Sequence, residues 1–249
     1  MSIEIKTLSM AKKILKDTYL YNLKQCKTKD EKKYLIAKYE HSCDCLKILK
    51  KYDNARFKNY EIAMLLHDIG RFFEYKKYKN FEHAYYGYKY LKKYYTQNPH
   101  ILLPIKYHEK DLEWKVELSK DKEFLSINLN GRNELQIGCL YVREIDVISN
   151  MKYILKNKIH DRNCMINDEL VSNLDLGKLA EKDQIKNDAD EIIYILCGLN
   201  IFETQQGKRY LKKYKIIKKM LNKLEQLIDE NDRKKYEKIV DIIKTRYYF

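Results

Sequence analysis

Apolar side chains recur every three or four residues along most of the chain, which is the pattern of amphipathic helices. In the first such segment Leu8, Ala11 and Ile14 fall on one side. A later segment places His83, Gly87 and Leu91 on one face at a spacing of four. The pattern predicts helices over about residues 5–25, 30–51, 55–69, from 81 onward, 99–108, 134–155, 188–197 and, as a pair, 207–248.

Two stretches interrupt this periodicity. Residues 109–133 carry no sustained helical stripe, and Asn130-Gly131 is a turn signal, so we expect a small hairpin there. Residues 158–185 are polar and predict a loop with short helices.

Gly70 follows an apolar run and is expected to end its helix as a C-terminal cap. Pro99 after Asn98 is well placed as the first residue of the next helix.

Composition favours the same fold class. The 249 residues include only seven glycines and two prolines, about a third of the usual share, which excludes collagen and turn-rich β-sandwiches. The hydrophobic share of 45% is enough for a real core. We therefore expect an all-α helical bundle forming a single domain over residues 1–249. No apolar run approaches the length of a membrane span and the N-terminus lacks the apolar part of a signal peptide, so we expect a soluble, cytoplasmic protein without a membrane partner.

The six cysteines are scattered, and none forms a CxxC pair. In a reducing compartment such cysteines are most simply small buried hydrophobic residues. On this reasoning we assign them no chemistry.

The chain is strongly basic, with a formal net charge of +14. Residues 208–223 hold eight lysines and arginines and no acid, while Tyr210, Ile217 and Leu224 fall on one apolar stripe. A basic amphipathic helix can contact nucleic acid or an anionic membrane surface. It can equally be a packed helix with a solvated basic face, and we favour this second interpretation because the chain carries no signature of a nucleic-acid module.

Histidine is the scarce residue that carries candidate chemistry. Only six are present, and His67 is followed directly by Asp68 after the apolar run MLL. An imidazole and a carboxylate adjacent at a helix end can bind one metal ion together, and the carboxylate can bridge to a second. Four histidines with two carboxylates and no thiolate form a nitrogen and oxygen ligand set, which suits Fe, Mn, Zn, Ni or Mg. We expect His100 and His160 to be surface residues outside this set.

The segment HDIGRF, with a histidine before it and an aspartate after it, resembles the HD-domain superfamily of metal-dependent phosphohydrolases. The likeness is strong over residues 41–151 and fainter over 188–221, within the predicted basic C-terminal helices 188–248. It implies an HD-domain helical bundle with its metal site between core helices. Matched position by position, it implies the metal ligands His41, His67, Asp68, His83, His108 and Asp146. The chain departs from the family around its last ligand, where Glu144, Val147 and Ser149 replace an aspartate, a lysine and an aspartate.

The resemblance also implies a reaction. Two divalent ions would activate a water that attacks phosphorus in a phosphoester or phosphoanhydride, most simply of a nucleotide. Asp68 would bridge the ions and act as the catalytic residue, accepting the proton. Arg71 and Arg143 are the predicted substrate contacts. The alternative is an inactive HD-fold module that binds a nucleotide or nucleic acid through its basic surface.

Overall fold

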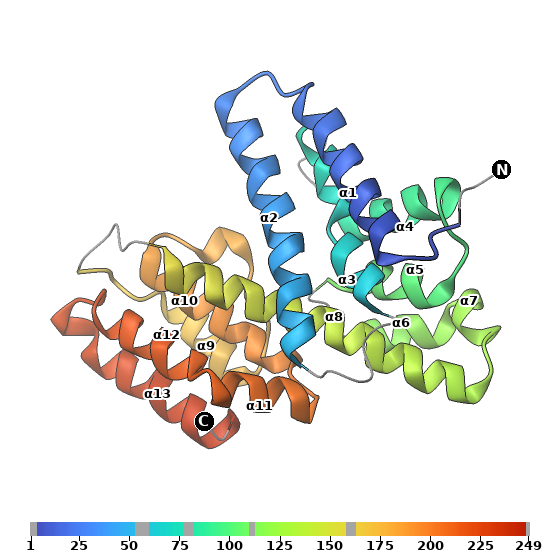
Figure 1. Ribbon diagram of the computed structural model, residues 1–249. Helices are drawn as coiled ribbons and strands as arrows, with labels where there is room; N and C mark the ends of the chain where they lie inside the picture. Colours follow the sequence, from blue (N-terminus) through green and yellow to red (C-terminus); the bar gives the residue numbers. More distant parts are fainter. Residues whose placement is uncertain (1–3, 53–59, 77–81, 110–112, 158–162, 248–249) are drawn as a thin grey trace. The chain divides into compact units, whose positions relative to one another are not determined.

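The structure is a computed structural model, and its elements are α-helices and short 3-10 helices (Figure 1). It describes residues 4–52, 60–76, 82–109, 113–157 and 163–247. Among these residues the one β-pairing is an isolated bridge between Cys164 and Ile228. The predicted all-α fold is therefore confirmed. Within the described ranges no helix is long and apolar enough to cross a lipid bilayer.

The chain divides into two compact units, Met1–Ile145 and Asp146–Phe249. The boundary falls inside one continuous helix, α8 (Leu129–Lys156). The single domain expected over residues 1–249 stays a prediction.

The first unit is arranged around one short buried helix. Its other helices are α1 (Leu8–Leu23), α2 (Lys29–Tyr52), η2 (Ile69–Lys76), α4 (His83–Tyr94), α5 (Pro99–Lys106), α6 (Trp114–Lys120), α7 (Lys122–Leu125) and the first part of α8. The central helix α3 (Glu61–Leu66) packs against α1, α2 and α5. From Ala63 to Leu66 every side chain is buried, as expected of a helix surrounded by others. The α3 helix thereby carries the residues that follow it into the centre of this unit.

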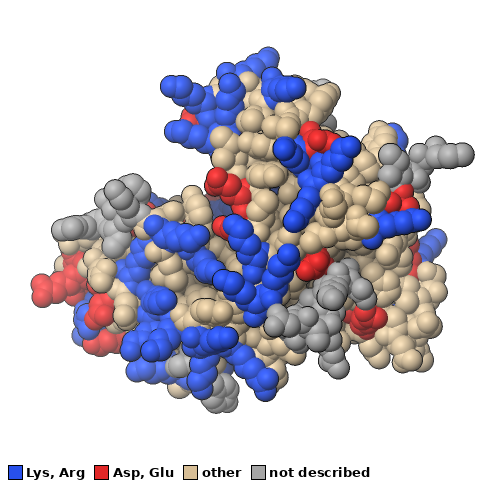
Figure 2. All heavy atoms as spheres, in the orientation of Figure 1, with Lys and Arg blue, Asp and Glu red and all other residues tan. Residues whose placement is uncertain are grey.

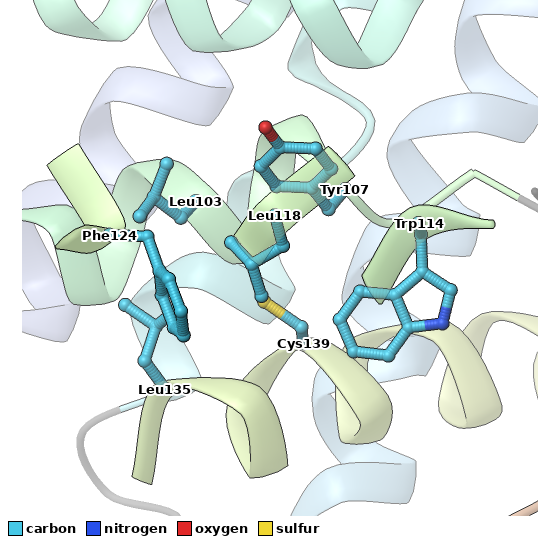
Figure 3. Close-up of a cluster of buried hydrophobic side chains, with 7 residues drawn as sticks. All are labelled: Leu103, Tyr107, Trp114, Leu118, Phe124, Leu135 and Cys139. Carbon is cyan, nitrogen blue, oxygen red and sulfur yellow. The ribbon is translucent and has the colours of Figure 1, made fainter. Parts of the chain in front are cut away.

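The hairpin expected near Asn130-Gly131 is wrong. This segment is helical: α6 and α7 follow one another, and Gly131 lies in the first turn of α8, where its amide donates to the Asn128 side chain. The apolar side chains that seemed irregular along the sequence converge in space instead. A buried cluster is formed by Leu103, Tyr107, Trp114, Leu118, Phe124, Leu135 and Cys139 (Figure 3). Two short helices can each contribute one or two residues to such a cluster without showing a long periodic stripe.

The second unit is a separate group of helices. Besides the end of α8 it holds α9 (Asp168–Leu176), η3 (Lys182–Gln184), α10 (Asp188–Cys197), η4 (Gly198–Ile201), α11 (Gln205–Lys213), α12 (Ile216–Glu225), η5 (Glu230–Asp232) and α13 (Arg233–Tyr247). The predicted polar loop 158–185 contains α9, which begins at an Asn167 cap and ends at Gly177 in the left-handed conformation. His160 lies outside the described residues.

The basic segment 208–223 is two helices rather than one. Between α11 and α12, Lys215 adopts the left-handed conformation with φ of 51°, which ends the first helix. Tyr210, Ile217 and Leu224 are buried, as the apolar stripe predicts. Basic side chains are not confined to this segment, because Figure 2 also shows lysine or arginine side chains over α1 and α2 of the first unit. The positive charge is thus spread over the surface of both units.

Candidate metal centre

The His67-Asp68 pair lies where α3 ends. His67 is the C-cap residue of α3 and is fully buried, and Asp68 is 4% exposed. The chain then continues directly into η2, with the amide of Arg71 donating to the Asp68 carbonyl at 2.9 Å. This tight 3-10 continuation keeps the pair inside the core.

Three further histidines reach this pair from three other elements. His41 lies in the middle of α2, His83 is the first residue of α4, and His108 follows the end of α5. His83 is 5% exposed and His108 is 2% exposed. Four imidazoles from four elements therefore surround one buried carboxylate.

The Asp68 carboxylate divides these imidazoles into two pairs. Its Oδ1 lies 3.1 Å from His83 Nε2 and 3.4 Å from His108 Nε2. Its Oδ2 lies 3.9 Å from His41 Nε2 and 4.0 Å from His67 Nε2. Each oxygen of the carboxylate thus has its own pair of imidazole nitrogens within 4.0 Å, and groups of these side chains could hold a metal ion.

Hydrogen bonds on the far side of three rings orient them toward the carboxylate. The Nδ1 atoms of His67 and His108 each lie 2.7 Å from a carbonyl oxygen three residues earlier, so each Nδ1 carries a proton and donates. His83 Nδ1 lies 2.8 Å from Glu109 Oε1 and donates in the same way. These acceptors assign the tautomer of each neutral ring: the proton is on Nδ1, and the lone pair of Nε2 faces inward. Histidines that bind a metal through Nε2 adopt this tautomer.

The inward-facing atoms fit a cation. His83 Nε2 and His108 Nε2 are 3.0 Å apart, and both face Asp68 Oδ1. Two lone pairs and a carboxylate oxygen at this separation repel one another unless a positive charge lies between them. Buried imidazole and carboxylate ligands, each held by a second hydrogen bond, suit a divalent transition metal.

Comparison with known families agrees with this geometry. Residues 39–151 match the family model of the HD domain. The match supports membership of the HD-domain superfamily over this part of the chain. No curated protein and no solved structure matches it. Members of this superfamily are generally metal-dependent hydrolases, and the buried histidine and aspartate side chains of this chain could hold a metal ion.

Charge around the HD pair keeps its carboxylate ionised. Without a metal ion, the imidazoles around Asp68 can also carry a proton on Nε2. Burial then opposes ionisation of Asp68, but the charges of His67 and Arg71 and hydrogen bonds from the protonated rings of His108 and His83 hold its pKa well below the ordinary range. Burial likewise disfavours the charged form of His83, yet its bonds to the two carboxylates raise its pKa. The Asp68 carboxylate is thus available as an anionic ligand throughout the neutral range.

Two glycines bring η2 and α4 of the HD domain together beside the site. A β-carbon on Gly70 would lie 2.9 Å from the His83 carbonyl carbon and closer still to its oxygen, and one on Gly87 would lie 3.2 Å from the Gly70 nitrogen. The C-terminal cap predicted at Gly70 is wrong, because α3 ends at Leu66 with His67 as its C-cap and Gly70 has no positive φ. Gly70 is required because the backbone of His83 passes against it.

The predicted substrate contacts differ in their surroundings. Arg71 is partly exposed at the edge of the cluster, with its Nε 3.4 Å from Asp68 Oδ1. Arg143 is 1% exposed, donates to the carbonyls of Tyr107 and Glu109, and lies over the Trp114 ring. In this position Arg143 holds the segment that carries His108, and contact with substrate stays a prediction for both arginines.

Asp146, the last predicted ligand, is the first residue of the second unit. It lies on α8 and accepts a hydrogen bond of 3.2 Å from the Asn150 side chain. Its participation in the metal centre of the first unit stays a prediction. His100 lies outside the cluster beside the Tyr60 ring.

Sequence reasoning missed three residues of the site. Glu109 orients His83, Lys38 Nζ lies 3.9 Å from Asp68 Oδ2, and Cys45 Sγ lies 3.5 Å from His41 Nε2. Lys38 and Cys45 stand one helical turn before and after His41, so the helical spacing of α2 was a usable signal for both. For Glu109, the one usable signal in the sequence was that it directly follows His108.

Proposed function

We propose that this HD domain is a phosphohydrolase with a two-ion centre that cleaves a phosphoester or phosphoanhydride bond, with nucleotides as the substrate class. The observation that carries the proposal is the division of four imidazoles between the two oxygens of Asp68. His41 and His67 would hold one divalent ion, with Asp146 as the further predicted ligand. His83 and His108 would hold the other.

When bound, divalent ions would neutralise charge at phosphoryl oxygens and would supply a water that ionises near neutral pH. Asp68 would help to hold the ions through its ionised carboxylate and would take the proton of that water. His67 and His108 keep their rings in place through the Nδ1 bonds to carbonyl oxygens, and Glu109 does the same for His83. The geometry is therefore set before substrate arrives, which is how a preorganised site lowers a barrier.

Two cationic side chains support an anionic substrate. Lys38 and Arg71 lie on opposite sides of the Asp68 carboxylate, and their side chains are 26% and 22% exposed. Both can reach solvent while staying close to the centre. Lysine binds phosphate as a point charge and arginine through a planar pair of donors, so together they provide a phosphate contact beside the nucleophile.

The test is a hydrolysis assay across phosphomonoesters, phosphodiesters and nucleoside polyphosphates after loading with Mn²⁺, Fe²⁺ or Zn²⁺. We expect turnover of at least one class, lowered at least about a hundredfold by Asp68→Asn. His100→Gln is the matched control, because that histidine lies outside the cluster, and it should leave the rate unchanged. Nucleotide binding without turnover under any metal would contradict the proposal and favour a binding module.

A further inference from the structure

Cys45 stands apart from the other cysteines by its position beside the metal centre. It lies one turn after His41 on α2, so the two side chains share a face of that helix. The Cys45 side chain is fully buried, whereas Cys43, two residues earlier, is only partly buried. A residue pair spaced by four on a helix can chelate one ion, as paired histidines do at this spacing in zinc enzymes.

The ligand atoms of three residues meet at this point. His41 Nε2, Cys45 Sγ and a ring nitrogen of His67 all lie within 4.8 Å of one another. His67 directs its Nε2 inward because its Nδ1 is occupied by the Met64 carbonyl. The contact between Sγ and His41 Nε2, at 3.5 Å, brings the thiol to the nitrogen that would bind the ion. Of the six cysteines, Cys45 is the one found in such a group of described residues.

We propose that Cys45 is a thiolate ligand of the ion held by His41 and His67. The inference rests on the two-ion centre proposed above. When the sulfur–metal bond forms, the thiol proton leaves to solvent, and the resulting thiolate neutralises one positive charge of the ion. A soft sulfur donor favours Zn²⁺, Fe²⁺ or Co²⁺ over the hard ions Mg²⁺ and Mn²⁺. The ligand set is then nitrogen, oxygen and sulfur, rather than the nitrogen and oxygen set expected from sequence.

Cobalt titration of the full-length metal-free protein tests the ligand directly. Thiolate bound to Co²⁺ gives an intense charge-transfer absorption in the near ultraviolet, which imidazole and carboxylate do not give. We expect this absorption in the wild-type protein and its loss in Cys45→Ser. Cys43→Ser is the matched control on the same helix and should keep the absorption. We also expect Cys45→Ser to bind Zn²⁺ at least about tenfold more weakly at this site.

A second measurement avoids dependence on a variant. X-ray absorption of the zinc-loaded wild-type protein should show a sulfur neighbour at about 2.3 Å. Cobalt binding without charge-transfer absorption, or zinc with only nitrogen and oxygen neighbours, would overturn the assignment while leaving the phosphohydrolase intact. A sulfur-bound ion without any hydrolysis would support Cys45 and refute the proposed function. Absence of any metal binding would refute both.

Discussion

Replacing Gly70 with alanine tests whether a close backbone approach positions the second pair of metal ligands. The added β-carbon would lie 2.9 Å from the carbonyl carbon of His83. Non-bonded carbon atoms prefer a separation of about 3.5–4.0 Å, so η2 and the first turn of α4 must separate by at least about 0.6–1.1 Å, and further to clear the carbonyl oxygen of His83. The obstructing atoms belong to the backbone, so a change of side-chain rotamer cannot relieve the overlap.

The cost can be estimated from two opposing effects. Overpacking of a core costs about 1–3 kcal/mol. The smaller conformational entropy of the unfolded alanine chain offsets about 0.4–1 kcal/mol of this. Because the obstructing atoms belong to the backbone, the upper end of this cost applies. We therefore expect Gly70→Ala to lower the free energy of unfolding by about 2–2.6 kcal/mol, which corresponds to a fall in Tm of about 4–10 °C.

The effect on the metal centre should be larger than the effect on stability. Metal–ligand distances tolerate deviations of about 0.2 Å, whereas the expected shift of His83 is several times greater. Calorimetric titration should show loss of the ion at His83 and His108 and retention of the ion at His41 and His67. Gly87→Ala is the control on the facing helix and should be milder, because its nearest backbone contact is 3.2 Å. Two ions bound at wild-type affinity with an unchanged Tm in Gly70→Ala would refute the reasoning.

Three other predictions concern charged residues around the centre. In metal-free protein, the hydrogen bond from His83 outweighs burial and lowers the pKa of Glu109 to about 2. Since the folded pKa is below the unfolded one, the stability gained from Glu109 is present above about pH 4.5 and is lost as pH falls toward 2. In Glu109→Gln the free energy of unfolding should therefore depend less on pH between these values. An unchanged pH dependence would contradict the pairing of Glu109 with His83. Arg143→Met leaves the carbonyls of the His108 segment without their donor and should cost about 2–4 kcal/mol in urea unfolding, whereas a loss below about 0.5 kcal/mol would show that this contact is unimportant. Arg71→Ala should raise KM about tenfold with little change in kcat, and a fall in kcat alone would instead place Arg71 in transition-state stabilisation.

Local pattern was enough to predict most helices, whereas the resemblance to the HD-domain superfamily pointed to the four histidines that the structure places around Asp68. Helical periodicity reports which face of a segment is apolar, and this can be read within a few turns of the chain. The His67-Asp68 pair after an apolar run was visible for the same reason, because α3 is buried on every side. The hairpin near Gly131 failed because α6 and α7 are too short to show a stripe.

Tertiary packing decided what the sequence left open. The role of Gly70 depends on α4 passing against it, and the burial of Arg143 depends on carbonyls more than thirty residues away. Cys45 looked like an ordinary core residue until His67, from another helix, was placed beside it. Spacing along one helix indicates which side chains share a face. The ligands of a metal site come from several helices, so the distances between those helices decide which side chains meet. Those distances come only from how the helices pack.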